Sequence, residues 1–328
     1  MAGFMCRVVV PWLRLHALPA MLPAPRALRC RLQVPLVTDP PGEIAPTPRT
    51  DEARLSGSAS SGAMPRLELS PDEIHLWCAP HEDIRGPELE AAYGCLLSPS
   101  ERTRQGRFRF DRDRHRFLVT RALVRTVLSR YASVRPEDWE FAANPHGRPH
   151  IANADAECTG LTFNVSHTDG LIVLGVARGM RLGVDVEFVS DRAGVLEIAP
   201  GFFTAQEVAD LQGLPAGLRQ QRFFEYWTLK EAYIKARGEG LSIPLDQFGF
   251  TLRGERGVAL WTDPRLADTA SAWRFQQFRL SPRHLLAVCS DKAANARIRT
   301  SIRTVVPLFS EQVLELRPTR CSQSIALP

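Results

Sequence analysis

The sequence predicts an α+β fold in which helices interleave with mostly antiparallel strands. Three observations support this prediction. Short apolar runs of strand type lie between residues 161 and 188, helix-type patterns cover residues 99–131 and 220–236, and Gly, Asn, Asp and Pro separate these segments. With 328 residues, of which 44% are hydrophobic, the chain can bury one large core or two modest ones.

Local signals indicate each element in turn. Ser98-Pro99 opens one helix over residues 99–131, Thr204 with Glu207 forms a capping box for a second helix, and Gly238 ends a third over residues 220–236. The apolar run 171–177 and the run 182–188 are joined by a short turn, so we expect them to pair as a hairpin. Further strands are expected at residues 74–77, 140–141, 161–167, 248–252, 272–275 and 284–288.

The positive charge of the chain lies in its flanks. The net charge is +5, yet residues 1–63 carry 7 Arg against 4 acidic residues and residues 292–328 carry 6 basic against 2 acidic ones. Residues 64–291 therefore hold 28 basic and 30 acidic residues, which argues against a nucleic-acid partner for the core. The seven scattered cysteines include no CxxC pair, which indicates a reducing cytoplasm, and no apolar run is long enough to span a membrane.

Residues 1–63 differ in composition from the rest of the chain. They are rich in Arg, Pro, Ala and Ser and contain no acidic residue before Asp39, as an organelle transit peptide does. A start codon wrongly assigned upstream of Met64 would also add a segment of such composition. We favour a mis-assigned start or a disordered tail over a targeting signal, because the Pro-rich composition argues against a packed structure.

Acidic side chains interrupt an apolar strand at Asp185 and Glu187. Alternation along a strand puts both on one face, and Glu231 and Lys235 lie one helical turn apart on one face of their helix. A solvent-facing strand edge and a helical ion pair worth about 0.3–0.5 kcal/mol are the ordinary explanations. The chain has only three lysines, however, and two of them lie in this helix. Converging carboxylates and an ammonium indicate a divalent-metal and phosphate site.

Ser166-His167 lies at the end of a predicted strand. Neighbouring residues on a strand point to opposite faces, so this pair cannot act as nucleophile and base. A phosphate contact fits better, because serine offers a hydroxyl and histidine an N–H donor. Arg116 and Arg148, taken singly, would be ordinary surface residues.

In combination, these segments resemble the 4′-phosphopantetheinyl transferases, in particular the larger, monomeric, Sfp-like type. The resemblance covers roughly residues 71–290. It rests on four motifs in order, which are Phe163-Asn164-Val165-Ser166-His167, Leu182-Gly183-Val184-Asp185-Val186-Glu187, Phe202-Phe203-Thr204 with Glu207, and the helix from Trp227 to Lys235 followed by Gly238.

The resemblance implies a fold, a reaction and partners. Two similar halves related by a pseudo-twofold axis would cover residues 64–180 and 181–291, the second carrying the metal site, with extensions at 1–63 and 292–328. The enzyme would move the phosphopantetheine arm of coenzyme A to a serine of an acidic acyl or peptidyl carrier protein and release adenosine 3′,5′-bisphosphate. A non-catalytic protein that binds carrier domains or coenzyme A on the same fold is the alternative.

The resemblance also implies roles for residues. Asp185, Glu187 and Glu231 would bind Mg²⁺, Lys235 would contact the diphosphate, and Glu231 would act as base directly or through a bound water. Four basic residues would bind the ribose phosphate with help from the Ser166 hydroxyl. These basic residues are Arg104, Arg116, Arg148 and His167. One departure stands out, since Glu101 occupies a position where the family often has a basic contact with coenzyme A, with Arg102 beside it.

Overall fold

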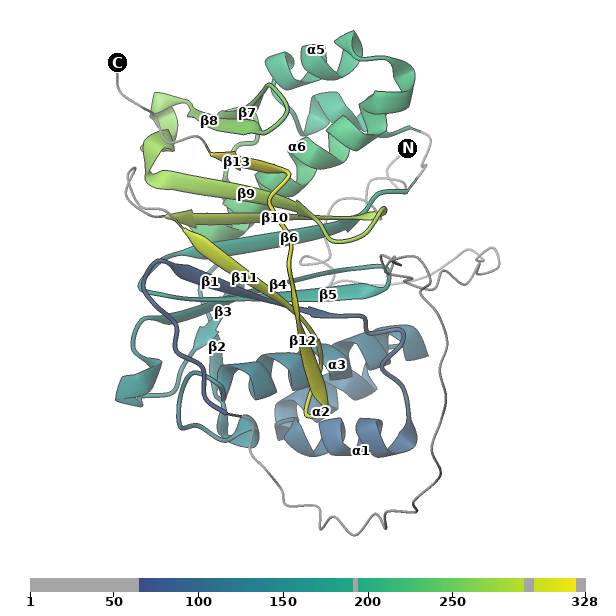
Figure 1. Ribbon diagram of the computed structural model, residues 1–328, viewed down its shortest axis with the longest axis vertical. Coiled ribbons are helices and arrows are strands. Elements are labelled where there is room, and N and C mark those ends of the chain that lie inside the picture. Colours follow the sequence, from purple (N-terminus) through teal and green to yellow (C-terminus); the bar gives the residue numbers. More distant parts are fainter. Residues whose placement is uncertain (1–64, 191–193, 292–297, 323–328) are drawn as a thin grey trace, which may run out of the picture. The chain divides into compact units, whose positions relative to one another are not determined.

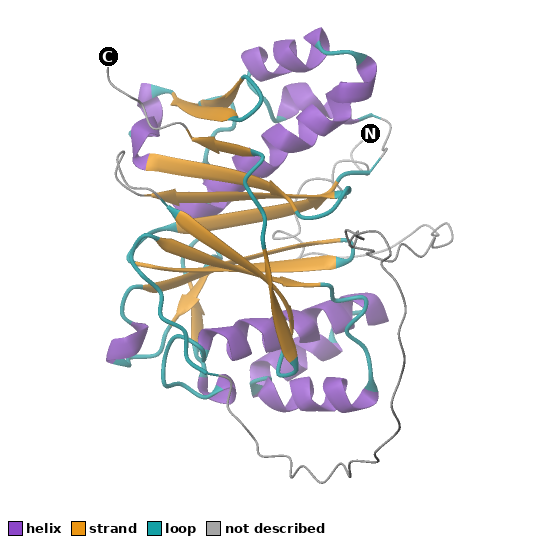
Figure 2. Ribbon diagram, viewed as in Figure 1, coloured by secondary structure: helices purple, strands orange, loops and turns teal. Residues whose placement is uncertain are grey.

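A computed structural model describes residues 65–190, 194–291 and 298–322. These residues form four layers, because two β-sheets pack face to face and helices cover the outer face of each sheet (Figure 1). Figure 2 shows the same arrangement by secondary structure. The predicted α+β class is confirmed. The prediction for residues 1–63 lies outside the described residues.

The first sheet has the strand order β12-β11-β1-β5-β4. Its pairs are antiparallel except for β1 with β11, which run parallel. Its strands are β1 (Glu73–Ala79), β4 (Leu161–Thr168), β5 (Leu171–Arg178), β11 (Arg299–Val306) and β12 (Ser310–Leu314). The helices α1 (Pro87–Leu96), α2 (Pro99–Gly106) and α3 (Asp111–Leu128) cover its outer face, and β2 (Phe141–Ala143) pairs with β3 (Pro149–Ile151) in a separate hairpin.

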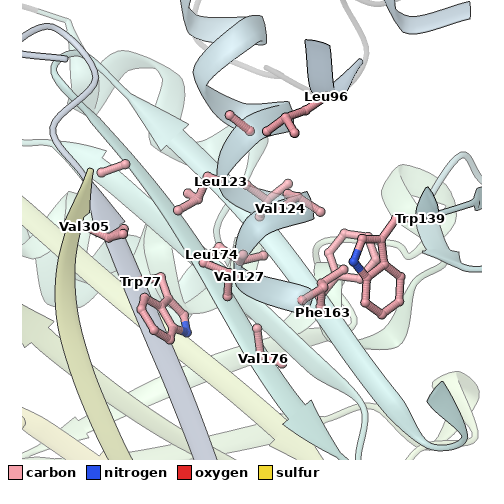
Figure 3. Close-up of a cluster of buried hydrophobic side chains, with 14 of the residues drawn as sticks. Trp77, Leu96, Leu123, Val124, Val127, Trp139, Phe163, Leu174, Val176 and Val305 are labelled. Atoms are coloured by element: carbon pink, nitrogen blue, oxygen red, sulfur yellow. The ribbon is translucent and has the colours of Figure 1, made fainter. Parts of the chain in front are cut away.

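The core between the first sheet and its helices follows from strand alternation. Trp77 on β1 and Leu174 on β5 point toward α3, where Leu123 and Val127 lie against them (Figure 3). All four side chains are at least 98% buried. The next residues along each strand face the second sheet instead, so β5 is buried on both faces, which explains its unbroken apolar sequence.

The second sheet has the strand order β6-β10-β9-β13-β8-β7. Its strands are β6 (Leu182–Phe188), β7 (Phe248–Arg253), β8 (Gly257–Thr262), β9 (Trp273–Arg279), β10 (His284–Asp291) and β13 (Arg320–Ser322). The helices on its outer side are α4 (Val195–Ile198), α5 (Ala205–Gly213) and α6 (Ala216–Arg237). The predicted capping box of α5 is present, and Gly238 ends α6 in a left-handed conformation with φ of 75°.

The prediction of a single helix over residues 99–131 is wrong in one respect, because the chain forms two helices there. α2 ends at Gly106 and α3 begins at Asp111. Glycine is a poor residue for a helix interior. Phe108 in the connection packs against Phe117 of α3 with 5.4 Å between the ring centroids, which folds the connection back onto the second helix.

The predicted hairpin of residues 171–177 with 182–188 is also wrong. β5 pairs with β1 on one side and β4 on the other, so it has no free edge for β6. β6 crosses instead to the second sheet and pairs with β10. Its apolar residues Leu182 and Val184 then pack on the face of the first sheet. Two strands close in sequence therefore belong to different layers.

Polar side chains join the edge strands of the two sheets, β4 and β6. Three side chains of β4 accept hydrogen bonds from three backbone N–H groups of β6. The pairs are Asn164 with Val184 (2.8 Å), Ser166 with Val186 (3.3 Å) and Thr168 with Phe188 (3.0 Å). Buried backbone N–H groups need partners. The alternating Asn, Ser and Thr of β4 provide them, because no strand pairing joins the two sheets in the described part of the chain.

The segment after residue 291, which the sequence predicts as an extension, adds strands to both sheets. β11 and β12 join the first sheet, and β13 joins the second. Ile302 of β11 is buried between the two sheets and Val305 on the helix side. The division into halves at 64–180 and 181–291 stays a prediction.

Candidate active site

The site lies where α6 packs on β6. Gly183 makes this approach possible, since a Cβ atom at that position would lie 2.5 Å from the backbone nitrogen of Ala236 and closer still to the carbonyl oxygen of Ala232. The helix therefore rests directly on the backbone of the strand. Asp185 and Glu187 follow Gly183 on the same face of β6, and both point toward α6, as alternation predicts.

Lys235 of α6 joins the two sheets at this point. Its Nζ donates to Asp185 Oδ1 (2.6 Å), to Ser166 Oγ (2.9 Å) and to the carbonyl oxygen of Val184 (3.1 Å). The Ser166 hydroxyl in turn donates to Asp185 Oδ1 at 3.0 Å. The structure thus brings together Asp185, Ser166 and Lys235 from β6, β4 and α6. The Ser166 hydroxyl therefore donates its hydrogen bond to the Asp185 carboxylate and not to His167.

Glu187 and Glu231 complete an acidic group around Lys235. Burial, followed by the charge of Asp185, raises the pKa of Glu187 to about 8 and that of Glu231 to about 7, while Lys235 opposes both shifts. Glu187 also accepts a hydrogen bond from Trp227 Nε1 at 3.2 Å. One ammonium does not neutralise three carboxylates, so two of them hold protons far more tightly than an exposed carboxyl would.

The donor chemistry of this group fits a divalent cation. Among the described residues Asp185 Oδ2 is buried and has no hydrogen-bond partner, which is costly for a carboxylate oxygen. Carboxylate oxygens are also the ligands that Mg²⁺ prefers. Within residues 65–190, 194–291 and 298–322, however, no three His, Cys, Asp or Glu side chains stand as a ready-made metal-binding cluster.

A second group, formed by Arg116 and two histidines, lies beside the acidic one. Burial, followed by the charges of Arg116, Lys235 and His81, lowers the pKa of His167 to about 3. His81 is buried as well, and its pKa falls to about 4 through burial and, among other neighbours, Arg116. Two of the predicted phosphate contacts, Arg116 and His167, therefore come together. Sequence reasoning missed His81, because a single histidine in the loop after β1 carries no motif.

Two other predicted phosphate contacts are engaged elsewhere. Arg104 lies with its guanidinium 5.7 Å from the centroid of the Phe117 ring on α3. Arg148 donates to backbone carbonyls at the end of α6 and the start of β6. In the described part of the chain neither arginine forms a hydrogen bond with His167.

Glu101, the departure from the family pattern, has a structural role. It completes the capping box of α2 with Ser98, and it forms ion pairs with Arg121 (3.2 Å) and with Arg125 (2.8 Å), which is 2% exposed. Burial opposes ionisation of Glu101, yet Arg121, the Ser98 N–H and Arg125 hold its pKa below the ordinary value. A carboxylate is required here because two arginines of α3 need a buried counter-charge.

We expect Glu101→Ala to destabilise the protein by about 3–5 kcal/mol, because it removes the carboxylate that balances the charge of the buried Arg125. Urea unfolding of the variant and wild type measures the difference. Asp111→Ala is the matched control, since Asp111 pairs with Arg114 at the surface and is 91% exposed. It should leave the midpoint nearly unchanged. Equal midpoints for the two variants would contradict the role assigned to Glu101.

Comparison with known proteins identifies the class. Residues 181–289 match the 4′-phosphopantetheinyl transferase superfamily, and residues 86–178 match the family described as 4′-phosphopantetheinyl transferase, N-terminal. The chain is 34% identical over 209 residues to the 4′-phosphopantetheinyl transferase HetI of Nostoc sp., covering 64% of this chain and 84% of the relative. It is 32% identical over 196 residues to the 4′-phosphopantetheinyl transferase Sfp of Bacillus subtilis, covering 60% and 82%.

A third relative has a similar level of identity. A phosphopantetheinyl transferase of Thraustochytrium sp. is 32% identical over 241 residues, which cover 68% of this chain and 81% of the relative. The chain therefore belongs to the 4′-phosphopantetheinyl transferase superfamily and is an enzyme that transfers a 4′-phosphopantetheinyl group. In the part of the chain that the structure describes, no helix has the length and apolar character to cross a bilayer.

Proposed function

We propose that the enzyme takes the 4′-phosphopantetheine moiety from coenzyme A and transfers it to a serine hydroxyl of an apo acyl or peptidyl carrier protein. The observation that carries this proposal is the meeting of Lys235, Asp185 and Ser166 where the two sheets join, with Glu187 and Glu231 beside them. The serine oxygen forms a bond to the phosphorus that bears pantetheine. The bridging oxygen of the diphosphate leaves with adenosine 3′,5′-bisphosphate.

Glu231 is the proposed base for the carrier serine. Burial, followed by the charge of Asp185, raises the pKa of Glu231 above that of an exposed carboxyl, which makes its carboxylate a stronger base. Glu231 therefore takes the hydroxyl proton as the oxygen attacks phosphorus.

Lys235 is proposed to stabilise charge on the diphosphate. An ammonium has three N–H donors, and three acceptors already surround its Nζ, the carbonyl of Val184 being the most distant at 3.1 Å. A diphosphate oxygen would replace at least one of them. Asp185, Glu187 and Glu231 would hold Mg²⁺, which supplies further positive charge to the diphosphate when bound.

The ribose phosphate of coenzyme A is proposed to lie against Arg116, with His81 and His167 beside it. Arg116 forms an ion pair with Asp113 at 2.9 Å and is partly exposed, so its guanidinium has donors left for a phosphate. His167 has a pKa of about 3 through burial and neighbouring cations, so it is neutral before the ligand binds. A neutral imidazole still has one N–H to donate.

A mass-shift experiment tests the proposal. Purified protein with Mg²⁺, coenzyme A and a small panel of apo carrier proteins should add one phosphopantetheine mass to at least one carrier. Asp185→Ala should abolish the mass gain while keeping affinity for the carrier. No mass gain on acyl or peptidyl carriers by wild type would refute the proposal, and carrier binding without turnover in both forms would favour a non-catalytic binding protein.

A further inference from the structure

The turn between β2 and β3 reaches across to the C-terminal end of α6. Arg148 in this turn donates from Nη1 to the carbonyl oxygens of Lys235 and Ala236, the latter at 2.8 Å. Its Nη2 donates to the carbonyl oxygen of Leu182, also at 2.8 Å. One guanidinium therefore holds the last turn of α6 and the first residue of β6 together.

Asn144 prepares the turn for this contact. Its Oδ1 accepts from the backbone N–H of His146 (3.0 Å) and of Arg148 (2.9 Å), and its backbone N–H donates to the carbonyl of Arg148 at 2.9 Å. Its Nδ2 donates to the carbonyl oxygen of Gly238 at 2.8 Å. The side chains of Asn144 and Arg148 thus reach the end of α6 from one preorganised turn.

The end of α6 needs such donors. The last carbonyl groups of a helix have no partner within the helix, and they form its negative end. Ala236 and Leu182 are fully buried, so water does not easily replace a lost donor at their carbonyls. The planar fork of arginine can serve several acceptors at once, which a lysine ammonium on a flexible stem would not do in the same geometry. Gly238 leaves room for it, since a Cβ there would lie 3.0 Å from Arg148 Cδ.

The carbonyls that Arg148 holds belong to the two segments whose side chains meet in the site. Two are the carbonyls of Lys235 itself and of Ala236, and the third belongs to Leu182, three residues before Asp185. The 2.6 Å contact between Lys235 and Asp185 depends on the position of α6 along the strand β6. We propose that Arg148 is a positioning residue that sets α6 against β6 and thereby places Lys235 on Asp185, and that it is not a phosphate contact.

This proposal rests on the proposed function for its kinetic test. The test compares Arg148→Lys and Arg148→Ala with Arg178→Ala, a matched control in which the lost guanidinium also holds backbone carbonyls, those of Glu157 and Thr159, but none of α6. For a positioning residue both Arg148 variants should lose about 100-fold in kcat, with the KM for coenzyme A changed less than about threefold. Arg178→Ala should keep both constants.

A phosphate contact would behave differently. Arg148→Lys would then keep most of the activity, because a lysine ammonium also binds phosphate, and Arg148→Ala would raise the KM for coenzyme A. That pattern would overturn the proposal. The midpoint of thermal unfolding is measured for each variant. The kcat values are then measured well below that temperature, so that they refer to folded enzyme.

A spectroscopic measurement tests the positioning without any turnover. The chain contains only three lysines, Lys230, Lys235 and Lys292, so protein labelled with ¹³C at lysine Cε gives three signals. The Lys235 signal is assigned by its loss in Lys235→Met. It should shift in both Arg148 variants and stay in place in Arg178→Ala. An unchanged Lys235 signal in Arg148→Ala refutes the positioning role of Arg148. If the signal shifts in Arg148→Ala but the wild-type protein has no transferase activity, only the proposed function is refuted.

Discussion

Gly183→Ala is expected to destabilise the protein by at least about 3 kcal/mol, at or above the upper end of the usual cost of overpacking a core. The added methyl group would meet the backbone of α6 at Ala232 and Ala236, and backbone atoms cannot rotate away as a side chain can. Either α6 moves off β6 or the strand bends. Both changes would also separate Lys235 from Asp185, so activity of any folded fraction should fall.

Two other glycines provide matched controls. At Gly175 on β5 a Cβ would meet the Val184 side chain at 2.7 Å, which can adjust, so Gly175→Ala should cost less than Gly183→Ala. At Gly217 in the first turn of α6 nothing lies within 4 Å, so Gly217→Ala should not lower the free energy of unfolding. Urea unfolding of the three variants measures the order. A Gly183→Ala variant as stable as Gly175→Ala would contradict the close packing of α6 on β6.

Sequence patterns predicted those parts of the site that depend on local geometry. Alternation put Asp185 and Glu187 on one face, and the spacing of one turn put Glu231 and Lys235 on one face of α6. The capping box of Thr204 with Glu207 is likewise a short-range signal, and the structure confirms it. These arrangements need only the periodicity of a single element, which the sequence carries directly.

Contacts between distant segments could not be predicted in the same way. Alternation does not tell whether β6 pairs with its neighbour in sequence, and the filled edges of β5 decide that it does not. Arg148 and its helix-end acceptors are 87 and 88 residues apart, and Glu101 meets Arg125 24 residues away. A family position implied a phosphate contact for Arg148, whereas its acceptors in the structure are carbonyls of Leu182, Lys235 and Ala236.

Lys235→Ala is expected to lower kcat by about 10²–10³-fold, the usual effect of removing one preorganised donor that stabilises transition-state charge. The variant loses the ammonium that would meet the diphosphate, and it also leaves Asp185 Oδ1 with only the Ser166 hydroxyl. Lys235→Arg should not restore activity, because the larger planar guanidinium does not fit between Asp185, Ser166 and the Val184 carbonyl. The mass-shift assay at saturating coenzyme A measures the rates.

Lys230 separates this chemical role from a general need for a buried lysine in α6. Its Nζ lies 3.1 Å from Glu207 and donates to the carbonyls of Leu245 and Phe248, so it ties α6 to α5 and β7 away from the acidic group. Lys230→Met should therefore lower the free energy of unfolding while folded enzyme keeps its kcat. Lys235→Ala should do the reverse, with a large loss in kcat and a smaller change in stability. If turnover by Lys235→Ala equalled that of wild type at saturating coenzyme A, the ammonium at this position would have no part in leaving-group stabilisation, and the acidic group would need another source of positive charge.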